Sequence, residues 1–307
     1  MRPFERILVD IDATAGAHPA LDRAIGLARR WGARVRIVDV VHVPGPALRY
    51  LAPRMRDQLV SERRERLMEI QRGTTDLAVE VDVLVGRPAI ALIQDVLRSG
   101  HDLLIRSHAR DLAQREAKPY GTVDMQLFRN CPCPVLAVGP GMPRRPTRVL
   151  AAVNADVDDP VEQQLNAKLI ELGLLMAEPD GGSLTVLQAW AAFAESMVRG
   201  HTTADEFTAY LDQAEEVARD GLKALTGPFG ARLAGARIEM RQGDPEDVIP
   251  DFVVAEGIDL VVMGTVARTG IAGLLIGNTA ERLLRRLPCS VLAVKPDGFR
   301  SPVQPAP

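Results

Sequence analysis

The chain has 307 residues, of which 47% are hydrophobic and 25% are charged, and its formal net charge at pH 7 is -3. A chain of this length and hydrophobicity can bury two ordinary cores without the help of metal ions or disulfides. The small negative charge leaves no basic surface field for nucleic acid, so the composition argues against a nucleic-acid-binding protein.

The chain also lacks the sequence features of a membrane or secreted protein. No apolar run approaches the roughly 20 residues that a membrane-spanning helix needs, and residues 1–10 lack the apolar core of a signal peptide. Three cysteines in a chain of this length suit a reducing compartment better than a disulfide framework. The sequence therefore predicts a cytoplasmic protein.

Strand and helix patterns alternate along the first half. Apolar runs and period-two patterns predict strands at 7–11, 35–41, 77–85, 103–105 and 135–138. Helical patterns between them cover 21–31, 57–72, a helix opened by Pro88 and closed by Gly100, and a helix from Gly121. The segment 139–146 is rich in glycine and proline and is predicted to be a linker.

The second half repeats this order. Its opening strand is predicted at 148–154, and Thr203 with Glu206 forms a capping box before a long amphipathic helix. Asp244 and Pro245 open a further helix that Gly257 ends. The strand 261–263, a helix from Gly277 and the strand 291–294 complete the unit.

Strands that alternate with helices and are apolar on both faces predict a parallel sheet covered by helices on both sides. The fold class expected is therefore α/β, with two tandem Rossmann-like domains that each hold a five-stranded parallel sheet. The predicted domains are residues 1–141 and 146–297. Residues 298–307 belong to a proline-rich end that is predicted to be a disordered tail.

The end of each half has nearly the same sequence. Residues 121–138, GTVDMQLFRNCPCPVLAV, align without a gap on residues 277–294, GNTAERLLRRLPCSVLAV. The constant offset is about one domain long, which indicates a tandem duplication. Cys133 and Cys289 take equivalent places in this alignment, so packing at the start of a strand is the simplest role for both.

The candidate site of the second half follows its fourth strand. Open α/β sheets bind ligands at the carboxyl ends of their strands, and here Gly264 and Thr265 begin a loop that ends at Gly277, where a helix opens with Asn278 and Thr279. Backbone N–H groups and the helix dipole at such a turn suit a phosphate. The glycines could equally serve only to make the turn.

These residues resemble a known family. The run 261–294, with MGT, GNTAE and PCSVLAV, resembles the C-terminal signature of universal stress proteins, and the tandem layout is most similar to their E-type members. The resemblance covers both halves and is more specific in the second. It implies a cytoplasmic, non-enzymatic stress-response protein that binds a small ligand or a protein partner. It also implies that the final strands, 135–138 and 291–294, pair within the chain as in a dimer of domains, with dimerisation of the whole chain as a further alternative.

The resemblance also implies a degenerate nucleotide site. Nucleotide-binding members carry glycine, two residues, glycine, nine residues, then glycine followed by serine or threonine. This chain has Gly264, Ala267, Gly277 and Asn278 at those four positions, so two of them have changed. Asn278 is still predicted to cap the helix.

The alternative function is that of an ATP-binding protein that uses only the second half, with magnesium and slow hydrolysis as part of this alternative. In that reading the phosphates are held by Gly264, Thr265, Arg268, Gly277, Asn278 and Thr279. Asn154, at the end of the opening strand, would lie near the base, where the family's nucleotide binders place an aspartate. An adenylyl-transferring enzyme is disfavoured because neither half has a HIGH-like sequence or an SGG-type loop after its first strand.

The first half departs from the nucleotide-binding pattern in the opposite way, because it keeps the aspartate and lacks the loop. Asp12 occupies the aspartate position, but residues 106–120 replace the loop and contain no glycine before Gly121. Asp10 and Asp12 lie two residues apart on one face of a strand, a spacing that is compatible with a magnesium site but is typical of a solvated strand end. The five histidines have no ligand spacing. The sequence predicts no metal site and no catalytic residue.

Overall fold

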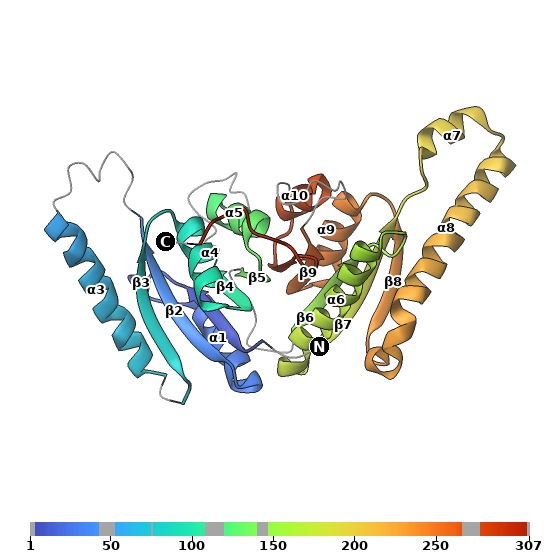
Figure 1. The fold of residues 1–307 in the computed structure, drawn as a ribbon. Helices are drawn as coiled ribbons and strands as arrows, with labels where there is room; N and C mark the ends of the chain where they lie inside the picture. Colours follow the sequence, from blue (N-terminus) through green and yellow to red (C-terminus); the bar gives the residue numbers. More distant parts are fainter. Residues whose placement is uncertain are drawn as a thin grey trace. The chain divides into compact units, whose positions relative to one another are not determined.

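The structure is a computed structural model that describes residues 4–42, 53–74, 76–107, 120–139, 147–265 and 277–305. The described residues form two compact units. The first contains residues 4–139, Thr265 and residues 289–305, and the second contains residues 147–264 and 277–288. Figure 1 shows strands flanked by helices in both. No described helix is long and apolar enough to cross a membrane.

The first unit follows the predicted order of elements. Its strands and helices are β1 (Arg6–Asp10), α1 (Pro19–Trp31), β2 (Arg34–Val41), α3 (Pro53–Arg72), β3 (Val79–Val85), α4 (Pro88–Ser99), β4 (Leu103–Ser107), α5 (Thr122–Asn130), β5 (Val135–Val138) and, from the end of the chain, β10 (Ser290–Val294). Helix α3 begins at Pro53, four residues before the predicted start. The prediction missed the first turn because Met55 is its only apolar side chain, and one apolar residue shows no helical periodicity.

The strands β3-β2-β1-β4-β5 form a parallel sheet in that order, which confirms the predicted fold of the first half. Helices α3 and α4 cover opposite faces of it. Arg36 and Asp39 point to opposite faces of β2 because side chains alternate along a strand. Arg36 reaches Asp95 of α4, whereas Asp39 is reached by Arg63 of α3.

The two strands that end the repeats pair with each other. β10 runs antiparallel to β5, with Val291 opposite Ala137 and Ala293 opposite Val135. All side chains of both strands are buried. The pairing therefore covers an edge of β5 that would otherwise present unpaired backbone groups, as the family resemblance implies. Strand β10 was expected in the second domain, but it clusters with the first unit.

The second unit is built in the same way from the second repeat. Its elements are β6 (Arg148–Val153), α6 (Pro160–Ala177), the 3-10 helix η1 (Glu178–Asp180), β7 (Ser183–Trp190), α7 (Glu195–His201), α8 (Ala204–Thr226), the 3-10 helix η2 (Gly227–Leu233), β8 (Arg237–Gln242), α9 (Pro245–Glu256), β9 (Leu260–Gly264) and α10 (Asn278–Leu284). The strands β9-β6-β7-β8 are parallel and lie in that order.

Equivalent helix ends confirm several local predictions. Gly100 ends α4 and Gly257 ends α9, both in the left-handed conformation with φ of 65° and 61°, which glycine adopts without strain. The Thr203–Glu206 capping box is present at the start of α8. Asp244 stands at the cap position of α9, although its side chain makes no capping hydrogen bond.

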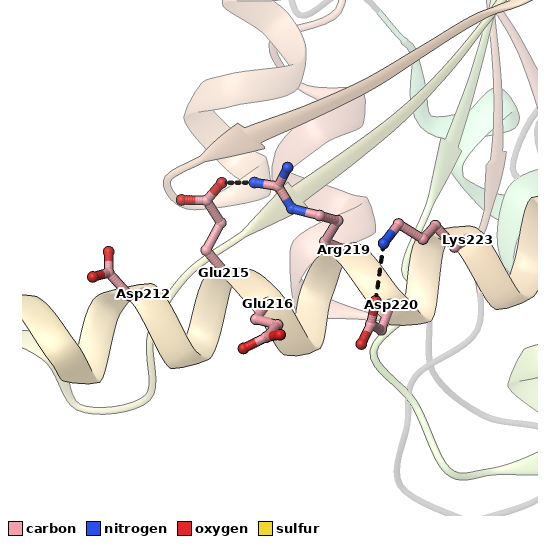
Figure 2. Close-up of a pocket in the computed structure, with 6 residues that line it drawn as sticks. All are labelled: Asp212, Glu215, Glu216, Arg219, Asp220 and Lys223. Atoms are coloured by element: carbon pink, nitrogen blue, oxygen red, sulfur yellow. Dashed lines mark hydrogen bonds and ion pairs between the residues drawn. The ribbon is translucent and has the colours of Figure 1, made fainter.

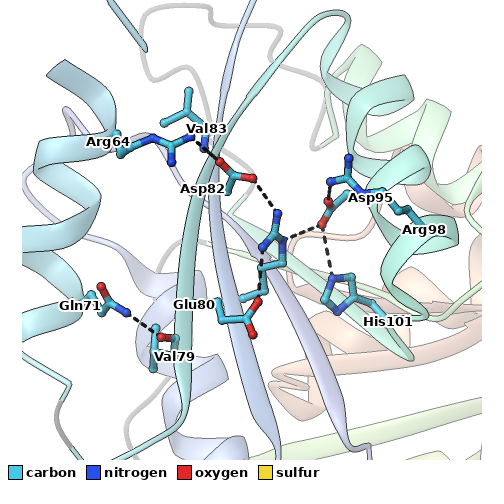
Figure 3. A network of polar contacts seen from close by, with 10 residues as sticks. Arg64, Gln71, Val79, Glu80, Asp82, Val83, Asp95, Arg98 and His101 are labelled. Atoms are coloured by element: carbon cyan, nitrogen blue, oxygen red, sulfur yellow. Dashed lines mark hydrogen bonds and ion pairs between the residues drawn. The ribbon is translucent and has the colours of Figure 1, made fainter. Parts of the chain in front are cut away.

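A polar network fastens α4 to the sheet (Figure 3). The Asp95 carboxylate is 1% exposed and lies 3.1 Å from Nε of Arg36 and 3.3 Å from Nε2 of His101, and it also contacts Arg98. Burial alone would raise the pKa of Asp95, but the close contact with His101 and the charge of Arg36 outweigh burial and lower it. Asp95 is therefore held as a carboxylate inside the unit.

We expect Gly182→Ala to lower the free energy of unfolding by about 2 kcal/mol, because overpacking forces the backbone apart. A Cβ at Gly182 would lie 2.1 Å from the backbone oxygen of Thr147, closer than real atoms approach. Gly227→Ala is the matched control, since its Cβ would meet nothing within 4 Å and its φ of -52° suits alanine. Urea denaturation of both variants measures the difference. Equal stability of the two variants would contradict this packing.

Candidate functional site

The strand order of each sheet reverses beside its first strand, which creates a crevice at the carboxyl ends of β1 and β4 and another at those of β6 and β9. In the first unit this crevice holds charged side chains. Arg106, at the end of β4, lies between Asp10 of β1 and Asp124 of α5, with N–O distances of 3.7 Å and 3.0 Å. These contacts are ion pairs rather than well-aligned hydrogen bonds.

The three residues of this Arg106 cluster, Asp10, Arg106 and Asp124, are largely removed from solvent. Their side chains are 13%, 18% and 5% exposed. Burial raises the pKa of Asp10 from 3.8 to about 6, against the opposing charge of Arg106. Asp124 is further held by a hydrogen bond from the backbone N–H of Gly121, at 2.9 Å. The cluster therefore fills the position where a ligand would enter a typical α/β crevice.

Asp12, the residue predicted to lie near a base and ribose, is also engaged within the protein. Its carboxylate accepts hydrogen bonds from the backbone and hydroxyl of Thr14, at 2.9 Å and 2.6 Å, and pairs with Arg63 of α3 at 2.5 Å. The hydroxyl of Thr14 contributes most to a lowered pKa of Asp12. Arg63 also pairs at 2.7 Å with Asp39, which is buried and accepts from the N–H of Ala13.

The second unit has apolar residues where the first has this charge. Aligned through their strands and helices, the two repeats place Ala152, Met263 and Ala280 at the positions of Asp10, Arg106 and Asp124. Met263 and Ala280 are buried. The second unit therefore lacks all three members of the Arg106 cluster, both acids and the arginine between them. At these three positions the second unit therefore has small or apolar side chains in place of the charged cluster.

Asn154 corresponds to Asp12, and its backbone is fixed by a residue that sequence reasoning did not single out. The side chain of Asn166, from α6, accepts from the N–H of Asn154 at 2.9 Å and donates to its carbonyl at 2.7 Å. Asn166 is 6% exposed. This two-way contact holds the chain in place directly after β6, as a short side-chain amide can do for a backbone turn.

Gln188 is the second residue that the sequence reasoning missed. It lies in β7 at the position of Asp39 and pairs in register with Val153, one residue before Asn154. Its side chain is 1% exposed, and its Oε1 has no hydrogen-bond partner among the described residues. Asp39, by contrast, has two partners. A buried acceptor without a partner costs about 1–3 kcal/mol, and such an atom calls for an explanation.

The two residues that begin the predicted phosphate loop, Gly264 and Thr265, belong to different units. Gly264 ends β9 so close to α6 that a Cβ there would meet Leu165 at 2.9 Å. Thr265 clusters with the first unit and is fully buried. Its hydroxyl donates to the carbonyl of Phe128 at 3.0 Å and accepts from Nζ of Lys295 at 2.6 Å. Packing thus accounts for both residues. Arg268 lies outside the described residues.

A helix begins at the end of the predicted loop, as expected, but its cap residue differs from the prediction. Gly277, with φ of -60°, is the cap residue of α10 because its carbonyl accepts the first helical hydrogen bond, from Glu281 at 2.9 Å. Asn278 is the first helical residue, so its prediction as the cap is wrong. The side chains of Asn278 and Thr279 are exposed. Asn154, Gly264 and these α10 residues belong to the same unit.

Metal ligands are not gathered in the part of the chain that the structure describes. No group of three or more histidine, cysteine, aspartate or glutamate residues there is placed to hold a metal ion. Cys131 and Cys133 are buried thiols with their sulfurs 3.6 Å apart, and Cys289 is partly buried.

Known proteins are similar to this chain in both sequence and fold. The family model described as the universal stress protein family matches residues 3–139 and 148–295. The chain is 30% identical over 315 residues to universal stress protein E of Escherichia coli K12, covering 99% of this chain and 98% of that protein. It is 26% identical over 322 residues to universal stress protein E of Photorhabdus laumondii, covering 100% and 99%.

A solved structure of a functionally unknown protein from Pseudomonas aeruginosa PAO1 has the same fold, with a TM-score of 0.70 and 24% identity over 97% of this chain and 95% of that one. The repeats observed in the sequence, the two α/β units and the matches to both halves agree with one another. The chain therefore belongs to the universal stress protein family, as a tandem protein of the E type with two such domains.

Proposed function

We propose that this protein is a non-enzymatic stress-response protein that binds one small organic ligand through its second unit, at the carboxyl ends of β6 and β7. Membership of the universal stress protein family supports the role in stress response. The observation that carries the binding proposal is the buried, unpartnered Oε1 of Gln188, one strand away from Val153 and Asn154. A ligand that donates an N–H or O–H to this atom would remove its desolvation cost.

The first unit supports the proposal by contrast. There the equivalent acceptor, Asp39, is satisfied by Arg63 and by a backbone N–H, and the Arg106 cluster fills the crevice with paired charge. A ligand entering the first unit would have to displace these ion pairs. The second unit presents no such charge at Ala152 and Met263, so the cost of ligand entry is lower there.

The residues present fit a triphosphate poorly. The hydroxyl of Thr265 is committed to Phe128 and Lys295, and Gly264 packs against Leu165. An asparagine follows Gly277, where nucleotide-binding relatives carry a hydroxyl. We therefore propose a ligand with a donor-bearing head and an apolar body, because Gln188 supplies one acceptor among apolar walls.

ATP binding by the second unit, with or without slow hydrolysis, is the second candidate function. The exposed side chains of Asn278 and Thr279 at the start of α10 favour it, since both could reach a phosphate from solvent. Calorimetric titration with ATP, with and without magnesium, separates the two candidates. Binding of ATP near one per chain, together with phosphate release, would support ATP binding as the function and contradict the proposal of a non-enzymatic protein with a different small ligand.

Replacing Gln188 by leucine should change stability and binding in opposite directions. The variant removes a buried acceptor that has no partner, so we expect the free energy of unfolding to rise by about 1 kcal/mol. The ligand loses one hydrogen bond, so we expect its affinity to fall about tenfold. Urea denaturation measures the first effect, and competition with the ligand recovered from the parent protein measures the second. A variant that is less stable than the parent would assign Gln188 a purely structural role.

The ligand itself can be identified from the purified protein. Small molecules released by heat from the full-length parent and from Gln188→Leu are separated by liquid chromatography and identified by mass spectrometry. We expect one compound near one per chain from the parent and much less from the variant. Adenine nucleotide in that fraction would favour the second candidate, and equal amounts of one compound from both proteins would contradict a site at Gln188.

A further inference from the structure

Ionisable side chains also gather outside the two crevices. On α8 they lie at the surface and pair along the helix, Glu215 with Arg219 and Asp220 with Lys223 (Figure 2). Surface pairs of this kind contribute little to stability and are screened by salt. In the first unit, by contrast, two thiols and an amine are buried close together. Buried reactive groups of this kind call for a chemical explanation.

The segment Cys131–Pro132–Cys133 joins α5 to β5. Cys131 is the C-terminal cap residue of α5, and its N–H donates to the carbonyl of Leu127 at 2.9 Å. The two cysteines are 1% and 8% exposed, and their sulfurs lie 3.6 Å apart. Proline between them restricts the backbone. The sulfurs are therefore held in contact, and an approach of about 1.5 Å would bring them to the length of a disulfide bond.

A buried amine lies close to this pair of thiols. Lys295 directly follows β10 and is 4% exposed. Its Nζ donates to the carbonyl of Phe128 and to the hydroxyl of Thr265. Burial lowers the pKa of Lys295 from 10.5 to about 7, and the charge of Cys131 opposes this shift. A lysine ammonium beside a thiol favours the thiolate, which is the nucleophilic form of cysteine.

Cys133 has the opposite character to Cys131. The contact with the Cys131 sulfur, together with burial, raises the pKa of the Cys133 thiol well above its usual range. Cys133 therefore stays protonated at neutral pH. A thiolate favoured by a nearby amine and a neutral thiol in contact with it are what a nucleophilic and a resolving cysteine require.

The second repeat lacks this pair of thiols. In the gapless alignment of the repeats, Leu287 stands at the position of Cys131, and Cys289 stands at that of Cys133. Leu287 is fully buried. Packing accounts for the cysteine that both repeats have. It does not require a thiol at residue 131, because a leucine fills the same place in the second repeat.

We propose that Cys131 and Cys133 form a modification site for hydroperoxides, at which hydrogen peroxide converts the two thiols to a disulfide in the folded protein. The Cys131 thiolate attacks one peroxide oxygen and the O–O bond breaks. Cys131 becomes a sulfenic acid, and the hydroxide released takes a proton from Lys295 to form water. The Cys133 sulfur then attacks the Cys131 sulfur, the S–O bond breaks, and the hydroxyl leaves with the Cys133 proton as a second water. The two thiols lose two electrons and the peroxide gains them.

Burial sets the expected rate of this reaction. Peroxide reaches the thiols only when the segment opens locally, so the oxidation is slow and stoichiometric rather than a rapid turnover. Hydrogen peroxide is small and uncharged, so it enters such an opening more readily than a bulky hydroperoxide. The reaction uses residues of the first unit and does not depend on the ligand proposed for the second.

Mass spectrometry of the folded, full-length chain tests the site. The protein is treated with about 1 mM hydrogen peroxide, then unfolded, and its remaining thiols are alkylated before peptide mapping. We expect the parent and the control Cys289→Ser to lose two hydrogens from the peptide that contains Cys131 and Cys133. Cys131→Leu copies the second repeat and should form no bridge. Cys133→Ser should stop at a sulfenic acid on Cys131, which dimedone traps.

The variant Lys295→Met tests the role of the amine. We expect the bridge to form about tenfold more slowly than in the parent, because a smaller fraction of Cys131 is then thiolate. A variant that merely loosened the packing would expose the thiols and oxidise faster. Circular dichroism confirms that the variants are folded. Three alkylated thiols in the treated parent, a bridge that forms only after unfolding in urea, a bridge that includes Cys289, or a folded Lys295→Met that oxidises at least as fast as the parent would each overturn the proposal.

Discussion

Replacing Arg106 by methionine is expected to lower the free energy of unfolding by about 3–5 kcal/mol, since the change leaves buried carboxylates without their cation. Arg106 is the one cation that contacts both Asp10 and Asp124 among the described residues. Their side chains are 13% and 5% exposed, so water cannot fully replace the guanidinium. Urea denaturation at pH 7.5 measures the loss. A loss below about 1 kcal/mol would show that the cluster is solvated.

The second unit provides the matched control for this experiment. The triple variant Asp10→Ala/Arg106→Met/Asp124→Ala reproduces the apolar set Ala152, Met263 and Ala280 in the first unit. Replacing a buried ion cluster as a whole by apolar residues is often neutral or stabilising. We expect the triple variant to regain most of the stability that Arg106→Met loses. A triple variant less stable than the single one would contradict the equivalence of the two crevices.

The raised pKa of Asp10 predicts a specific dependence of stability on pH. The folded protein holds the Asp10 proton more tightly than the unfolded chain, because burial raises the pKa from 3.8 to about 6. The contribution of this group is therefore fully present below pH 3.8 and is lost as the pH rises through 6. A difference of about 2 pKa units corresponds to about 3 kcal/mol.

Asp10→Asn removes this titration and isolates its effect. The difference in unfolding free energy between variant and parent should shift by about 2.5 kcal/mol in favour of the variant between pH 4 and pH 7.5. Asp12 and Asp95, whose pKa values are lowered, titrate in the opposite direction, but they are present in both proteins and cancel. A difference that does not change with pH would show that Asp10 is ionised throughout this range.

The fold was largely predictable because the duplicated sequence gives each pattern twice. The signals that predicted it are local, because each involves residues close together in the chain. They are the apolar runs, the glycines at the ends of α4 and α9, and the Thr203–Glu206 capping box. The start of α3 was missed because its first turn is polar and exposed. The cap of α10 was misplaced by one residue because Gly277 and Asn278 are both acceptable caps.

The site was less predictable because its contacts join residues far apart in the chain. Asp39 meets Arg63 across 24 residues, and Thr265 meets Phe128 across 137. One signal was nevertheless present in the sequence. The aligned repeats exchange an acid, a base and an acid for alanine, methionine and alanine at three separate places. A compensated change of this kind indicates that the three residues touch, and it could have identified the Arg106 cluster.

Gln188 could not have been singled out from its neighbours in the sequence. A glutamine in a strand such as 183–190 is compatible with either an exposed or a satisfied side chain. Its importance comes from three-dimensional facts, namely its burial and the lack of a partner for Oε1 among the described residues. The two repeats thus differ in the way expected of duplicated domains with separate roles, since one crevice is closed by ion pairs and the other keeps an unused acceptor.

Native mass spectrometry of the freshly purified, full-length chain tests most directly whether the second unit alone holds a ligand. The parent, Asp12→Asn and Gln188→Leu are compared under identical conditions. We predict one bound small molecule per chain in the parent and in Asp12→Asn, and a largely empty Gln188→Leu. Two bound molecules per chain, a parent without any, or a ligand lost from Asp12→Asn and kept by Gln188→Leu would contradict this account.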